Sequence, residues 1–247
     1  MNSSPKRLCL PIALFVAIEI TLGVLLQITG GTATVACSWA AVWLACLFCA
    51  AFAEPTHAYL LTQLALVFTV AADYFLVVAD PRRQLPAMLC FSVTQLAYFL
   101  RILDADTRPR RRRVHLICRA SLSAAAILLT LLVLGKAADA VALVSMFYYA
   151  NLILNLLFAT LDCRRLPLLA VGLALFLLCD TVIGLDLLNT YLPIPEDAWI
   201  FRIIRPGFNL AWAFYLPAQT LLAISLLPDR CRRGLSGKKA FGKSASS

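Results

Sequence analysis

The sequence predicts an all-α membrane protein, a polytopic helical bundle of about eight transmembrane helices. Of its 247 residues, 62% are hydrophobic and 14% are charged, whereas a soluble domain carries about 25% charged residues. The apolar stretches run for about 20 residues, the length at which a helix crosses the hydrocarbon core. They contain little strand-like alternation, so we expect helices to satisfy the backbone in lipid.

Charges, prolines and glycines separate the spans. In chain order the breaks are Gly30-Gly31, Glu54-Pro55, Asp80-Pro81, Arg108-Pro109, Gly135-Lys136, Arg164-Arg165 and Pro206-Gly207. The spans between them are expected at 8–28, 34–53, 58–79, 85–103, 115–134, 139–160, 166–188 and 206–227. The first follows Lys6 and Arg7 as a secretory signal would, but its apolar stretch is longer and no clear cleavage site follows. We therefore expect it to be an uncleaved helix. Residues 1–228 are expected to form a single transmembrane domain, and residues 229–247 a basic, disordered tail.

Basic residues fall mainly on one side of the predicted bundle. The N-terminus, the loop at 104–114 and the tail hold most of the 22 basic residues. The positive-inside rule therefore places both termini in the cytoplasm, and the expected location is the cell membrane. The run at 110–113 lies next to a span and lacks a recognition fold. It therefore favours the lipid bilayer as partner over nucleic acid.

Two aspartates lie deep in apolar spans, Asp73 in Phe-Thr-Val-Ala-Ala-Asp and Asp180 in Phe-Leu-Leu-Cys-Asp. A carboxylate at the centre of a membrane helix costs roughly 2.5–3.5 kcal/mol on insertion scales, so such residues usually have a function. Both lie about 21–23 Å from the inner end of their spans, at about 1.5 Å per residue. The pattern predicts a paired acidic site at one depth, with a purely structural role as the alternative.

Further polar side chains are expected near the depth of Asp73 and Asp180. Their spacing groups Tyr148, Asn151 and Asn155 on one helix face, Tyr215 and Gln219 on a second, and Gln95 and Tyr98 on a third; Glu19 is a third buried acid. We expect Gln95, Tyr98, Tyr148, Asn151, Tyr215 and Gln219 to contact substrate. The alternative is interhelical hydrogen bonding, which is worth about 0.6 kcal/mol per bond in membranes.

The order of these residues suggests an internal repeat. A span with an aspartate precedes a span with a glutamine in both halves: Asp73 before Gln95, and Asp180 before Gln219. A four-plus-four duplication with parallel halves would produce this order. Chance similarity between apolar helices is the alternative.

The residue inventory narrows the chemistry. The two histidines, His57 and His115, fall at expected membrane edges, so neither a three-histidine zinc site nor a Ser-His-Asp triad fits the level of Asp73. Cys46 and Cys49 lack a second pair of ligands and are expected to be packing residues, and phosphate-binding glycine loops are missing. Carboxylate chemistry without metal or cofactor remains. Burial favours the neutral form of a carboxyl group, so one acid can hold a proton while the other is ionised.

At these residues the chain resembles the lysoplasmalogenase-like (YhhN-type) membrane family. That family has a Gly-Asp motif in the third helix and a His-Leu-Leu-Tyr-like motif in the fourth. A Ser-Asp motif follows in the seventh, and an aromatic residue then His or Gln in the last. Here the corresponding residues are Ala72-Asp73, Gln95-Leu96-Ala97-Tyr98, Cys179-Asp180 and Tyr215 to Gln219. The chain departs from the pattern where alanine replaces the glycine and Gln95 replaces the histidine, and it lacks a lysine-proline often seen in the second helix.

The resemblance implies hydrolysis of the vinyl ether bond of lysoplasmalogens, with Asp73 and Asp180 as catalytic acids and a lysophospholipid as substrate. Arg202 and Arg205 would lie near the outer entrance, where they would hold a phosphate or anchor the interface. Gln95 cannot take up a proton as histidine can, which leaves an inactive, lipid-binding relative as one alternative. A proton-coupled membrane transporter is the other, because buried acids and a repeat also fit that class.

Overall fold

Helices make up all the regular secondary structure in the described part of the chain. The structure, a computed structural model, describes residues 5–227 except residues 80, 107, 163, 193 and 196; the predicted tail at 229–247 lies outside them. The helices are α1 (Pro5–Ile28), α2 (Gly31–Phe52), α3 (His57–Asp73), η1 (Tyr74–Val78), α4 (Gln84–Ala105), α5 (Pro109–Leu134), η2 (Gly135–Ala137), α6 (Ala140–Leu161), α7 (Pro167–Leu188), α8 (Trp199–Ile204) and α9 (Leu210–Ile224). Seven are long and apolar enough to cross a membrane, which confirms the predicted multi-pass all-α fold.

The eighth expected span, at 206–227, contains the shorter helix α9, which has 15 residues. The α9 helix begins late because the side chain of Asn209 caps it, accepting a hydrogen bond from the Trp212 amide at 3.3 Å. Helix α5, in contrast, begins earlier than expected, at Pro109. Proline suits the first turn of a helix, which has no use for its missing N–H. The run of four arginines at 110–113, expected in a loop, is therefore helical.

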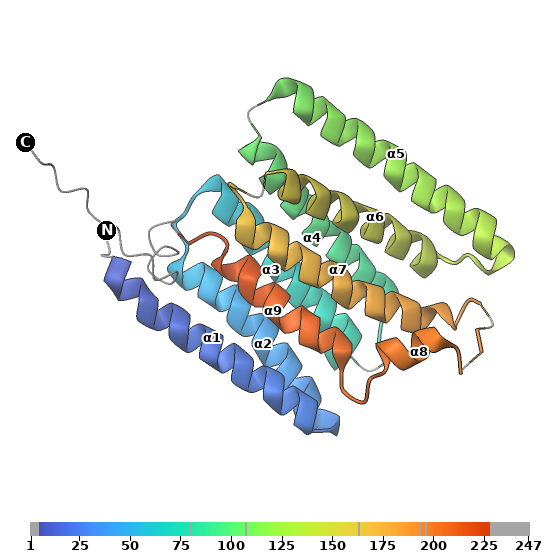
Figure 1. The fold of residues 1–247 in the computed structure, drawn as a ribbon, viewed down its shortest axis with the longest axis horizontal. Helices are drawn as coiled ribbons and strands as arrows, with labels where there is room; N and C mark the ends of the chain where they lie inside the picture. The colour runs from blue at the N-terminus through green and yellow to red at the C-terminus, as the bar shows by residue number, and fades with distance from the viewer. Residues whose placement is uncertain are drawn as a thin grey trace, which may run out of the picture.

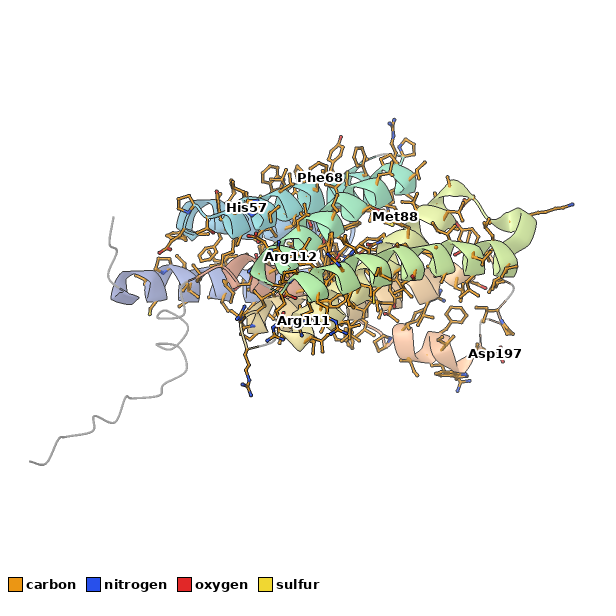
Figure 2. All side chains as sticks on the ribbon, turned by 90° about the horizontal axis from the view of Figure 1, so that it is seen from above. His57, Phe68, Met88, Arg111, Arg112 and Asp197 are labelled. Atoms are coloured by element: carbon orange, nitrogen blue, oxygen red, sulfur yellow. The ribbon has the colours of Figure 1, made fainter. Side chains whose placement is uncertain are left out.

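The long helices run side by side, and α1 and α5 lie on opposite edges of the bundle (Figure 1). We call the end where α2, α4 and α6 finish and α3, α5 and α7 begin the basic end. His57 lies towards this end and Asp197 at the other (Figure 2). The core is drawn from seven helices, α1 to α4, α6, α7 and α9, and its fully buried members include Val42, Leu66, Tyr98, Leu152, Leu173 and Leu222.

Helix contacts repeat between the two halves of the chain. In the first half α1 packs on α2, α2 on α3 and α3 on α4; in the second, α5 packs on α6, α6 on α7 and α7 on α9. The fourth helix of each half also packs against the second helix of the other: α4 against α6, and α9 against α2. This is the arrangement expected of a four-plus-four repeat, and it places Asp73 on α3 and Asp180 on α7 at equivalent positions.

The α3 helix changes its winding directly after Asp73. Residues Tyr74–Val78 form a π-helical turn, η1, in which the amide of Ala79 bonds the carbonyl of Tyr74 at 2.8 Å. A π turn inside an apolar helix is rare and often accompanies a functional residue. Here it follows one of the two buried carboxyl groups.

Candidate active site

The Asp73 carboxyl group is buried at the end of α3 and bonded to α9. The Tyr215 hydroxyl donates a hydrogen bond to Asp73 Oδ2 at 2.7 Å. The side chains are 3% and 4% exposed, so neither reaches the surface of the bundle. A buried carboxyl without a partner is costly, and the tyrosine hydroxyl supplies one. The sequence predicts Tyr215 near the depth of Asp73, but it does not predict the hydrogen bond between them.

The Asp180 carboxyl group has its own tyrosine. The Tyr148 hydroxyl, on α6, donates a hydrogen bond to Asp180 Oδ2 on α7. Tyr148 is buried, whereas Asp180 is half-buried. The next residue on each helix makes a second contact, because the hydroxyl groups of Tyr149 and Thr181 lie 2.7 Å apart. Each aspartate is thus held by a tyrosine from a neighbouring helix.

Aromatic rings join these two pairs. The ring centroids of Tyr148 and Phe91 lie 5.6 Å apart, those of Phe91 and Phe176 lie 5.8 Å apart, and those of Phe176 and Tyr215 lie 5.5 Å apart. We call these four residues the aromatic layer. Rings at such separations and tilts attract one another beyond their simple burial. The layer therefore fixes the relative positions of the two tyrosines.

The two aspartates lie at similar distances along their helices. Measured along their helices from the basic end, both aspartates lie at about 20–24 Å, at about 1.5 Å per residue. Their common depth in the membrane stays a prediction.

A polar network lies one to two helical turns nearer the basic end. Asn155 Nδ2 donates to the backbone oxygen of Gln95 at 2.8 Å and to its Oε1 at 2.9 Å. The guanidinium group of Arg119 donates to Asn155 Oδ1 at 2.6 Å and also to Asn151 Oδ1. The same guanidinium lies 4.0 Å from the centroid of the Phe99 ring. The network ties α4, α5 and α6 together.

The polar residues on one face of α6 have different partners. Sequence spacing grouped Tyr148, Asn151 and Asn155, but Tyr148 bonds α7 while the two asparagines bond Arg119 on α5. Sequence spacing alone assigns no role to Arg119. Two features of the sequence could have indicated its role. Arg119 directly precedes the apolar run 120–134, and the next helix carries two asparagines four residues apart, Asn151 and Asn155.

Three other expected site residues are buried with unused polar groups. In the described part of the chain no hydrogen-bond partner is present for the Tyr98 hydroxyl, for Gln95 Nε2 or for either amide atom of Gln219. Gln219 follows Tyr215 by one turn, as Gln95 follows Phe91. The two glutamines therefore occupy equivalent places directly below the aromatic layer. Glu19, on α1, is 4% exposed, and its two carboxyl oxygens likewise find no partner among the described residues.

The remaining predicted charged residues lie away from the aspartates. Arg205 is exposed and bonds Asp186 at 2.6 and 2.8 Å, and its guanidinium lies 4.7 Å from the Phe201 ring centroid. His57 is exposed and bonds Asp104 at 3.1 Å. His115 is 1% exposed and stacks on Phe158 with ring centroids 3.4 Å apart. Among the described residues, no three His, Cys, Asp or Glu side chains are grouped to hold a metal ion.

Fold and site together define a multi-pass helical membrane protein that holds two tyrosine-bonded carboxyl groups on either side of an aromatic layer. The sequence profile of the YhhN family matches residues 32–226, and the chain belongs to this family. Comparisons with curated proteins and with solved structures gave no match. Membership of the YhhN family suggests a lysoplasmalogenase-like function.

Proposed function

We propose that this protein is a membrane-embedded hydrolase that cleaves the vinyl ether bond of lysoplasmalogens, releasing a fatty aldehyde and a glycerophospho-alcohol. The observation that carries the proposal is the pair of tyrosine-bonded aspartates, Asp73 with Tyr215 and Asp180 with Tyr148, in a YhhN-family bundle. Two carboxyl groups of unequal surroundings, one buried and one half-buried, suit a division into proton donor and charge stabiliser.

The chemistry needs only these groups and water. One aspartate, in its neutral form, gives its proton to the vinyl carbon remote from the ether oxygen, which forms a C–H bond and an oxocarbenium ion. The other, ionised, stabilises this cation, much as paired carboxylates do in glycosidases. Water adds to the cation and returns a proton to the first aspartate. The resulting hemiacetal breaks its C–O bond to give the aldehyde and the alcohol, without metal or cofactor.

The other predicted substrate residues take two kinds of role in this proposal. Tyr148 and Tyr215 orient the carboxyl groups, and the unpartnered amides of Gln95 and Gln219 and the Tyr98 hydroxyl are available to water or to oxygens of the lysophospholipid. Asn151 is held by Arg119, so we assign it to support of the site and not to substrate contact.

The test is aldehyde release from a lysoplasmenyl lipid by purified protein in detergent. Wild type should release aldehyde, and Asp73→Asn and Asp180→Asn should each lose at least about 100-fold in rate while remaining folded. Asp186→Asn is the matched control, because Asp186 is on the same helix as Asp180 but exposed and paired with Arg205; it should keep its activity. Folded wild type without aldehyde release, or equal losses in all three variants, would refute the proposal.

A proton-coupled transporter is the second candidate, and the helix contacts repeated between the two halves favour it. The two functions differ in what they require. A hydrolase works in detergent, whereas a carrier needs a sealed vesicle and responds to a pH gradient. Uptake into proteoliposomes that depends on the gradient, without aldehyde release in detergent, would establish the transporter. An inactive lipid-binding relative would show neither activity and would still bind lysophospholipid.

A further inference from the structure

A second polar site lies at the basic end, away from the two aspartates. It is a cavity of about 370 Å³ formed where α4 is followed by α5 and α6 by α7. Its lining residues are Asp106, Arg108, Arg111, Leu161, Asp162, Arg164 and Arg165. The volume falls within the range of roughly 300–1,000 Å³ that small-ligand pockets have. Four arginines against two aspartates leave the lining with an excess of positive charge.

Two of the arginines build the wall. Arg111, on the first turns of α5 (Figure 2), bonds both carboxyl oxygens of Asp162 at 2.8 and 2.9 Å and lies 3.8 Å from Asp106 Oδ2. Arg165 donates to the backbone oxygen of Ala105 at 3.2 Å. These contacts hold the link between α4 and α5 against the link between α6 and α7. Both acidic residues of the lining, Asp106 and Asp162, thereby have Arg111 as a neighbour of opposite charge.

The other two arginines supply unneutralised charge. Arg108 and Arg164 are exposed, and in the described part of the chain neither side chain has a carboxylate partner. They come from different links and line the same cavity. Arginines that line one pocket favour a phosphate group, because the planar N–H forks of guanidinium groups match its oxygens.

The position of the cavity gives access to lipid. Leu161, at the end of α6, lines the cavity and is 55% exposed on a helix apolar enough to span the membrane. An acyl chain lying along α6 could therefore place its headgroup in the cavity. Basic pockets at the cytoplasmic ends of membrane helices bind anionic headgroups in this way.

We propose that this cavity binds a phosphate group, carried either by an anionic phospholipid of the adjacent leaflet or by a soluble phosphate ester. The site is separate from the aspartate pair and does not depend on the hydrolase proposal. It acts on the links between α4 and α5 and between α6 and α7, so its occupancy stabilises the basic end of the bundle.

The experiment measures thermal unfolding of the full-length protein in detergent while a ligand is titrated. Phosphatidic acid and glycerol 3-phosphate are the two phosphate probes, and phosphatidylcholine is the lipid without net charge. A ligand that binds only the folded state raises the unfolding temperature in a saturable way. We expect saturation with phosphatidic acid, with glycerol 3-phosphate or with both, and none with phosphatidylcholine. Which probe saturates identifies the source of the phosphate.

Two double variants that lose the same charge distinguish binding in the cavity from nonspecific attraction to the basic end. Arg108→Gln with Arg164→Gln should lower the affinity for the phosphate probe by about tenfold or more. Arg110→Gln with Arg113→Gln removes two exposed arginines of the same basic run that do not line the cavity, and should change the affinity less than about twofold. Equal weakening in both double variants, or no saturable effect in wild type, would overturn the proposal. Unfolding temperatures without ligand show that each variant is folded.

Discussion

Tyr215 donates its hydroxyl hydrogen to Asp73 across 142 positions of sequence, and in doing so joins the last helix to the third. The Tyr148–Asp180 bond, by contrast, spans 32 positions and joins consecutive helices. The two aspartates are therefore held in chemically similar but topologically different ways. The equivalent of Tyr215 in the first half is Phe91, which has no hydroxyl, so the repeat is broken at the residue that would bond Asp180.

Removing the Tyr215 hydroxyl tests whether this bond positions Asp73 for reaction. Tyr215→Phe should lower the rate of aldehyde release about 10- to 100-fold, because a misplaced catalytic group is costly. The free energy of unfolding should also fall, by about 1–3 kcal/mol, because the buried Asp73 carboxyl group loses its partner, so the rate is compared between folded proteins. Tyr149→Phe is the control, because it removes a similar bond, to Thr181, one residue from Tyr148. An unchanged rate in Tyr215→Phe would argue against a positioning role.

Arg119 and Asn155 should be energetically coupled. Hydrogen bonds to a charged group are stronger than those between neutral groups, so a double-mutant cycle of Arg119→Met and Asn155→Ala should give about 1 kcal/mol or more in the free energy of unfolding. A parallel cycle of Arg119→Met with Thr130→Val should give a value near zero, because Thr130 bonds the Ala126 carbonyl further along α5. Unfolding in mixed detergent micelles measures both. Additive effects in the first cycle would mean that the network stabilises nothing beyond its separate members.

Gly172 lies where α7 is tightly packed against α9. A methyl group added there would lie 2.9 Å from Leu222 Cγ and 3.3 Å from the Ala218 carbonyl oxygen. Gly172→Ala should therefore destabilise the protein by about 1–3 kcal/mol through overpacking. Gly184→Ala, on the same helix with nothing within 4 Å, should be close to neutral. Adding Leu222→Ala to Gly172→Ala should cost less than the sum of the single changes; strict additivity would contradict the proposed clash.

Replacement of Glu19 should stabilise the protein. Its carboxyl oxygens are buried without a partner in the described part of the chain, and such groups cost about 1–3 kcal/mol. Glu19→Met should therefore raise the free energy of unfolding by about 1–2 kcal/mol and leave aldehyde release unchanged. Ile20→Met, at a neighbouring exposed position, is the control and should be neutral. A loss of activity in Glu19→Met would instead add this third acid to the site.

Sequence sufficed for the existence and order of the seven long helices, because these follow from apolar runs separated by Pro, Gly and charged residues. It also predicted similar positions along their helices for Asp73 and Asp180, since a helix has a fixed rise per residue. Partners could not be predicted in the same way. Which side chain of α9 meets Asp73 depends on how each helix is rotated and on which helices are neighbours, and both follow from packing of the whole bundle.

Arg119 illustrates the same limit. A lone arginine near a helix end is equally compatible with an interfacial anchor, and only the position of α6 beside α5 shows that two asparagines hold it. The shortness of α9 and the presence of α8 were likewise missed. Both depend on local capping by Asn209 and on a loop whose apolar composition resembles that of a span.

The exchange of helices between the two halves has a consequence for biosynthesis. Because α9 packs against α2 and carries the partner of Asp73, the first half of the chain leaves the ribosome without a hydrogen-bond donor for this acid and without the helix that packs on α2. Domains usually fold from the N-terminus as they are made, but here the final helix must be translated before the earliest ones are complete. A nascent chain arrested before residue 210 would thus be a substrate for membrane quality control, however well its own helices have inserted.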